Sequence, residues 1–210
     1  MKLKVTGIVI DSNPYDESAK MVNILTPDGF FSLLAKGVRK KESKNRVLIL
    51  DCSLNELDYI QKNERNILTN GRNIISSDYL LSSYYGVIFM NFTKEVIYKV
   101  VLKEEAKELY AVLKEALEYI RKSDADKNVI LISMVRLFDK ALLVAGYDPL
   151  EYIKKETNKS NDESLSIIED IRNNTFFGKI TELNYSKLLE FLNSILFKFN
   201  NIKINSIEML

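Results

Sequence analysis

The residues of this sequence that are best suited to chemistry are cations, and they gather in one short stretch. Residues 36–46 carry six basic side chains and one acid, a net charge of +5, whereas the whole 210-residue chain carries +1. The basic residues are Lys36, Arg39, Lys40, Lys41, Lys44 and Arg46. A local concentration of cations attracts phosphate groups. On charge alone, a solvated surface loop is the more common interpretation of such a stretch.

The sequence lacks the residues that most enzymes use for catalysis. The chain contains no histidine and a single cysteine, Cys52. It therefore has no imidazole base, no Ser–His or Cys–His pair and no set of ligands for a structural zinc ion. The glycine-rich phosphate-binding loops of nucleotide enzymes are also missing. We expect no catalytic residue, no metal and no cofactor, and we interpret Cys52 as a small core residue.

The composition also indicates in which cellular compartment the protein works. A lone cysteine excludes an intrachain disulfide and is typical of the reducing cytoplasm. No apolar run approaches the roughly 20 residues of a membrane-spanning helix, and the N-terminus lacks the apolar centre of a signal peptide. We expect a cytoplasmic protein without membrane contact, whose nucleic-acid binding, if any, comes from a local patch.

The elements that must position the basic stretch are predicted to be strands. Residues 3–12, 19–26 and 30–36 are rich in β-branched or aromatic residues, with turn chemistry between them, and the third strand leads into the cations. Residues 52–61 and 67–76 supply two more strands. Five short strands without a helical period predict an oligonucleotide-binding (OB) barrel. Such barrels bind nucleic acid on one face and through bordering loops, so Tyr15, in the first turn, is a candidate for base stacking.

From Asp78 onward the apolar period changes to that of helices. Amphipathic or buried helices are expected over much of residues 78–210, with a polar linker or reduced insertion near 150–164. The predicted organisation is α+β with segregated parts. An OB-fold nucleic-acid-binding domain occupies residues 1–77, and a helical domain occupies residues 78–210.

Several short motifs are more specific than charge or periodicity. The N-terminal ones are Thr6-Gly7-Ile8-Val9-Ile10, Tyr15-Asp16-Glu17-Ser18, Leu25-Thr26-Pro27-Asp28-Gly29 and, above all, Leu34-Ala35-Lys36-Gly37-Val38-Arg39-Lys40 followed by Ser43. The segments 135–143 and 146–149 add a helical signature ending in Gly-Tyr-Asp-Pro. Together these motifs resemble the bacterial RecO family of recombination mediators in DNA repair. The resemblance covers residues 1–150 well and the remainder weakly.

The resemblance implies an N-terminal OB barrel and a helical C-terminal domain. It also implies binding to single- and double-stranded DNA, annealing of complementary strands and, with RecR, loading of RecA onto strands coated by the single-stranded-DNA-binding protein. Many family members carry a four-cysteine zinc site after the Gly-x-x-Pro segment. Here residues 150–161 contain no cysteine. We therefore expect the inserted subdomain to be shortened or held by packing alone.

The resemblance also implies that the acidic C-terminal tail of the single-stranded-DNA-binding protein is a partner. An acidic peptide with apolar residues requires apolar surface beside a cation. Arg136 and Lys140, one helical turn apart, with the adjacent Leu142 and Leu143, are the predicted site. Alternatively, the two cations form the solvated edge of a core helix and pair with nearby acids.

Other functions remain open from the residues themselves. An RNA-binding OB module would show the same barrel and cations, because phosphate contacts do not separate RNA from DNA. Competition between matched RNA and DNA would discriminate the two. A protein–protein adaptor would show no salt-dependent binding to oligonucleotides. An enzyme is the remaining possibility, and the missing histidine, metal ligands and phosphate loop disfavour it.

Overall fold

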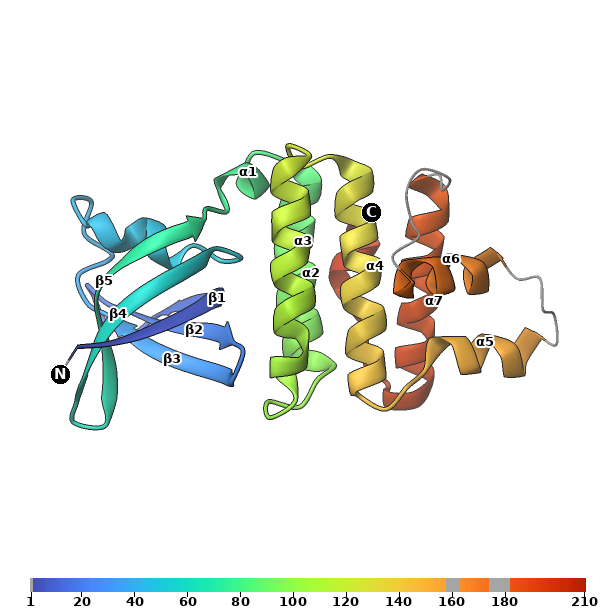
Figure 1. The fold of residues 1–210 in the computed structure, drawn as a ribbon, viewed down its shortest axis with the longest axis horizontal. Coiled ribbons are helices and arrows are strands. Elements are labelled where there is room, and N and C mark those ends of the chain that lie inside the picture. Colours follow the sequence, from blue (N-terminus) through green and yellow to red (C-terminus); the bar gives the residue numbers. More distant parts are fainter. Residues whose placement is uncertain (1, 158–162, 174–181) are drawn as a thin grey trace.

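The N-terminal part of the chain is a closed five-stranded barrel (Figure 1). The structure is a computed structural model that describes residues 2–157, 163–173 and 182–210. The strands are β1 (Lys2–Pro14), β2 (Lys20–Thr26), β3 (Gly29–Ala35), β4 (Leu54–Lys62) and β5 (Arg65–Ile75). Their order around the barrel is β1-β2-β3-β5-β4, with β3 and β5 parallel. The OB-like barrel predicted from the sequence is confirmed.

Strand β1 closes the barrel by pairing with two partners. Its first half pairs with β4 and its second half with β2, and a register irregularity between Val9 and Asp11 marks the change. A bulge at such a point bends the strand. Gly7 permits the close approach to β2, because a Cβ atom there would lie 2.7 Å from the carbonyl oxygen of Leu25. The interior is filled by apolar side chains that include Val9, Val22, Ile24, Leu33 and Leu57.

The described residues after the barrel are mostly helical, and α4 lies at their centre (Figure 1). The helices are α1 (Asp78–Leu81), α2 (Tyr84–Lys99), α3 (Tyr110–Lys122), α4 (Lys127–Val144), α5 (Pro149–Thr157), α6 (Glu163–Arg172) and α7 (Glu182–Asn200), with short 3-10 turns η1 (Lys44–Ile49), η2 (Ala106–Leu109) and η3 (Asn205–Met209). The carboxylate of Asp126 caps α4 by accepting hydrogen bonds from two backbone N–H groups. No helix in the described ranges is both long and apolar enough to span a bilayer.

The structure describes only part of the segment 150–164, for which the sequence predicts a polar linker or reduced insertion. Its first part forms α5, which begins at Pro149, a favourable first residue for a helix. Residues 158–162 lie outside the described residues. Helix α6 begins at Glu163 and returns the chain toward α4.

Part of the barrel shares a hydrophobic core with the helices. Ile8, Ile10, Leu25, Leu54 and Ile75 of the barrel belong to the same buried cluster as the centre of α2. The ring of Tyr98, on α2, stacks on Phe30 of β3 at a centroid distance of 5.8 Å. Its hydroxyl donates a hydrogen bond to the buried carboxylate of Asp11. These contacts fix the barrel against α2 and so define the surface between them.

An ionic cluster ties α6 to α4 and to the turn before α5. Arg172 donates two hydrogen bonds to Asp139, at 2.8 and 2.7 Å, and one to Asp148 at 3.0 Å. Burial raises the pKa of the Asp139 carboxyl, and the Arg172 guanidinium offsets only part of that rise. Burial opposes ionisation of Asp148 too, but bonds from Arg172 and the Leu150 backbone lower its pKa. This ionic contact joins α6 to α4 within the described residues.

Candidate nucleic-acid interface

The basic stretch follows β3 directly and is anchored by one apolar residue within it and another shortly after it. Val38 and Ile49 are buried against the barrel interior, and Gly37, directly before Val38, adopts a positive φ of 69°. This anchoring leaves the charged side chains on the rim. Five cations of the stretch are exposed and have no ion-pair partner among the described residues: Lys36, Lys40, Lys41, Lys44 and Arg46.

Arg39 differs from its neighbours because it joins the basic stretch to the β1–β2 turn. Its Nη1 donates to the carbonyl oxygen of Asp16 at 2.6 Å, and its backbone N–H donates to Ser18. The carboxylate of Asp16 accepts backbone hydrogen bonds from Ser18 and Ala19, which lower its pKa. The turn that carries Tyr15 is therefore positioned by Arg39 as well as by its own hydrogen bonds.

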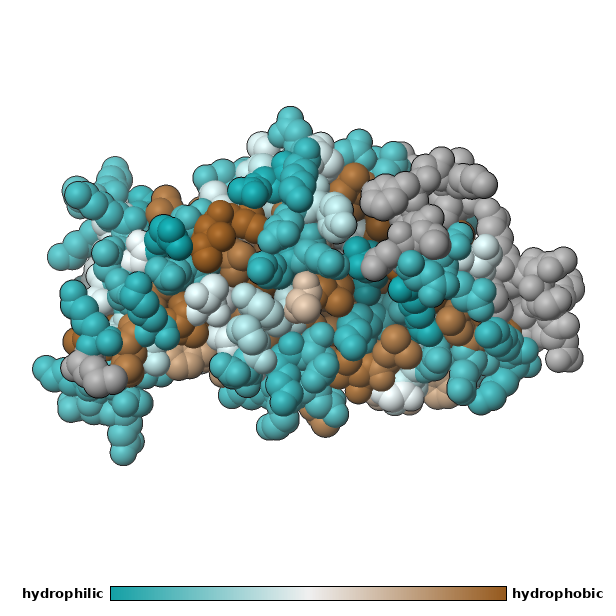
Figure 2. All heavy atoms as spheres, viewed as in Figure 1, coloured by the Kyte–Doolittle hydropathy of each residue, from teal (hydrophilic) through white to brown (hydrophobic). Residues whose placement is uncertain are grey.

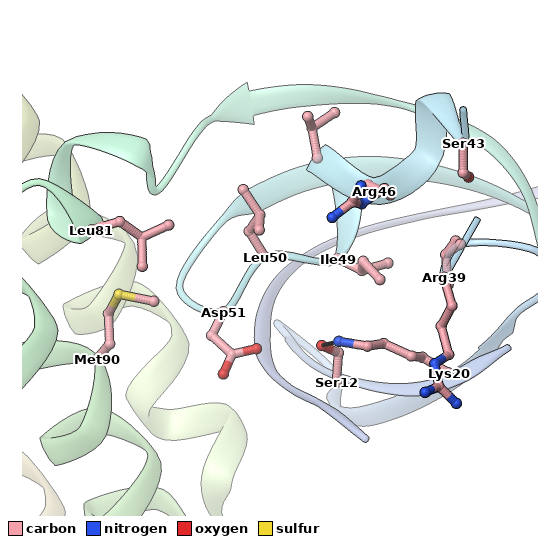
Figure 3. Close-up of a pocket in the computed structure, with 12 residues that line it drawn as sticks. Ser12, Lys20, Arg39, Ser43, Arg46, Ile49, Leu50, Asp51, Leu81 and Met90 are labelled. Carbon is pink, nitrogen blue, oxygen red and sulfur yellow. Dashed lines mark hydrogen bonds between the residues drawn. The ribbon is translucent and has the colours of Figure 1, made fainter. Parts of the chain in front are cut away.

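A groove of about 850 Å³ runs from the basic stretch to the first helices (Figure 3). Arg39, Arg46 and Lys20 line its barrel side, and Lys20 donates to Ser12 at 3.1 Å. Leu81 and Met90 approach from the helices, and Asp51 lies between the two sides (Figure 3). Burial raises the pKa of Asp51, although the nearby Lys94 opposes the rise. Arg39 and Arg46 are thus brought together, whereas Lys36, Lys40, Lys41 and Lys44 lie outside the groove lining.

Tyr15 is 45% exposed and pairs with a cation that the sequence did not single out. The guanidinium of Arg65 lies 5.4 Å from the ring centroid and donates to the Tyr15 hydroxyl at 2.6 Å. Arg65 begins β5, directly after the β4–β5 turn. Since the β1–β2 and β4–β5 loops border the same binding face in OB folds, that position is the signal that could have indicated Arg65.

We expect Tyr15→Ala to weaken single-strand binding by about 1–3 kcal/mol, the usual contribution of one base stacked on an aromatic ring. Fluorescence anisotropy with a labelled oligonucleotide measures the change. Tyr119→Ala is the matched control, because Tyr119 is 42% exposed and pairs with Lys122 on α3, away from the barrel. Equal affinities of the Tyr15 and Tyr119 variants would exclude stacking at Tyr15.

The predicted partner site on α4 is only partly on the surface. Leu142 is fully buried in the core, whereas Lys140 and Leu143 are half-buried. Arg136 donates to Glu115 of α3 at 2.9 Å. Lys140 and Leu143 therefore remain accessible to a partner. Arg136 is paired with Glu115, and Leu142 packs in the core beneath them.

The described part of the chain has no group of residues arranged for metal binding and no exposed thiol. No cluster of histidine, cysteine or acidic side chains there has the form of a metal site. Cys52 is buried beneath the barrel–helix contact, and burial raises the pKa of its thiol to about 12. A thiol in that state is a poor nucleophile. The zinc site that the sequence resemblance would imply does not fit these residues.

The comparisons with known proteins concern the barrel. Residues 1–72 match a family model described as "Recombination protein O N terminal". The matched segment spans β1 to β4 and most of β5, and it includes Tyr15, Arg65 and all six cations of the basic stretch. No curated protein sequence matches the chain.

Proposed function

Because residues 1–72 match the model of the recombination protein O family, we propose that the protein is a DNA-binding recombination mediator without enzymatic activity. The family gives the chain a role in recombination and DNA repair. The finer proposal is that it binds single- and double-stranded DNA and anneals complementary strands. With RecR, it would help to load RecA onto strands coated by the single-stranded-DNA-binding protein.

The observation that carries the proposal is the exposed basic stretch within the family-matched barrel. Five of its six cations point into solvent without an ion-pair partner in the described structure, so their charge is available to phosphates. Contacts of this kind release counterions and are independent of sequence. They suit a protein that must bind any damaged strand, and the stacking pair of Tyr15 and Arg65 lies on the same domain.

Competition binding tests the proposed ligand. We expect a labelled DNA strand to be displaced by unlabelled DNA at lower concentrations than by RNA of the same sequence, and its affinity to fall steeply with salt. Stronger competition by the RNA would assign the barrel to RNA instead. Absence of salt-dependent binding to either polymer would favour an adaptor role and contradict the proposal.

The acidic tail of the single-stranded-DNA-binding protein is proposed to bind α4 at Arg136, Lys140 and Leu143, above the buried Leu142. We expect Arg136→Glu to weaken binding of the tail peptide by about 2 kcal/mol or more, because repulsion replaces attraction beside a partly desolvated acid. Titration calorimetry measures the loss. Arg121→Glu on exposed α3 surface is the control for a general charge effect. If the two folded variants bind the peptide with equal affinity, the tail does not bind at Arg136.

A further inference from the structure

The groove between the barrel and the helices has two chemically different walls (Figure 3). The barrel wall presents Lys20, Arg39 and Arg46. The opposite end presents Leu81 and Met90 from α1 and α2, and Ile49 and Leu50 lie between the two ends, beside Arg46. Leu81 and Val47 are each 51% exposed, so both can contact a ligand in the groove. Figure 2 also shows apolar side chains gathered between the barrel and the first helices.

This polarity matches the two halves of a nucleotide. A nucleotide joins an anionic phosphate to a flat and largely apolar base. The cations lie on the barrel side of the groove, and Leu81 and Met90 lie on the helix side. The volume of about 850 Å³ lies within the range of sites that enclose small organic ligands. The groove is therefore large enough for a base with its sugar and phosphate.

Asp51 determines the orientation of such a ligand. Its carboxylate lies between the cationic and apolar sides and repels a phosphate that moves toward the helices. The same carboxylate can accept a hydrogen bond from an N–H group on the exposed edge of an unpaired base, such as N3–H of thymine. The phosphate is thereby kept at Lys20, Arg39 and Arg46, and the base is directed toward Leu81 and Met90.

We propose that this groove binds unpaired nucleotides with the base turned inward, and so gives the protein a preference for single strands over duplex DNA. The inference rests on the proposed DNA-binding function. In a duplex the bases are stacked and paired, and only the phosphates reach the rim cations. In a single strand the bases are free to enter a site built from apolar side chains.

The double variant Leu81→Gln/Met90→Gln tests the groove without removing any cation. We expect its affinity for an oligothymidine strand to fall about 5-fold or more, as for the loss of one base contact, while its affinity for duplex DNA stays at the wild-type value. Leu102→Gln is the matched control, because Leu102 is 67% exposed and does not line the groove. Thermal unfolding of all variants verifies that they are folded.

Abasic strands give an independent readout. If bases contact Leu81 and Met90, a strand with abasic positions should bind the wild type and the double variant equally, so that the two losses are not additive. Equal losses for single strands and duplex, or fully additive losses with abasic strands, would overturn the groove proposal. So would unchanged single-strand affinity combined with lost binding of a leucine-containing acidic peptide, which would assign the groove to a protein partner. Wild-type protein that binds no DNA would contradict the proposed function itself.

Discussion

Replacing Arg172 by alanine is expected to lower the free energy of unfolding by about 3–5 kcal/mol, the usual effect of removing one partner from a buried ion pair. Asp139 is only 3% exposed, and both of its carboxylate oxygens accept bonds from Arg172. Without the guanidinium, a buried carboxylate remains without its counter-charge. Urea denaturation followed by circular dichroism measures the loss.

Lys154→Ala is the matched control for Arg172→Ala. Lys154 joins α5 to α6 through Glu169 at 3.4 Å, but the two side chains are 59% and 43% exposed. An exposed pair of this kind contributes about 0–1 kcal/mol. If Arg172→Ala costs no more than the control, the ionic cluster does not hold α6 in place.

The loss caused by Arg172→Ala should also depend on pH. Removing the cation raises the folded-state pKa of Asp139 further above its unfolded value, and returns that of Asp148 from its lowered value toward the ordinary range. Both changes destabilise the ionised form, so the penalty is largest near neutral pH and shrinks as the carboxylates become protonated in acid. A penalty that is constant between neutral and acidic pH would attribute it to lost packing instead.

The triple variant Lys40→Ala/Lys41→Ala/Lys44→Ala should lose a large part of the salt sensitivity of DNA binding. Each phosphate contact contributes about one unit to the slope of log affinity against log salt, so the slope should fall by up to about 3. Between 50 and 200 mM salt, that difference amounts to about 60-fold in affinity. Arg39 is kept, because its bonds to Asp16 and Ser18 hold the β1–β2 turn.

Lys107→Ala/Lys114→Ala/Lys122→Ala is the control for total charge. These three lysines are exposed in the α3 region, and their removal changes the net charge equally. The control should retain the wild-type slope with any DNA sequence. Equal slopes for the two triple variants would show that the basic stretch does not contact phosphates.

The barrel could be predicted because its determinants are local. The β-branched runs, the Pro27-Asp28-Gly29 turn and the cations after β3 all lie within about 76 residues, and the strand order of the OB fold follows from few alternatives. The contacts within the candidate site could not be predicted in this way, because they join residues that are far apart in the sequence. Arg65 meets Tyr15 across 50 residues, and the groove requires Leu81 and Met90 to be brought to the barrel by the shared core.

In the helical domain, too, the sequence predicts which residues share a helix face but not which residues of other helices they contact. The spacing of Arg136 and Lys140 predicts that they share a face, but not that Arg136 reaches Glu115 on α3 or that Leu142 turns fully inward. The approach of Arg172 to Asp139, 33 positions away, depends on the path of α5 and α6. No periodicity encodes a pairing of that kind, because it is set by how the helices pack and not by any one of them.

The most direct test of the proposed function is strand annealing. Two complementary strands, one with a fluorophore and the other with a quencher, are each coated with the cognate single-stranded-DNA-binding protein and then mixed with or without this protein. We expect the wild type to accelerate quenching and the Lys40/Lys41/Lys44 alanine variant to be slower, particularly as salt increases. Identical quenching rates with and without the wild-type protein would contradict its role as a recombination mediator.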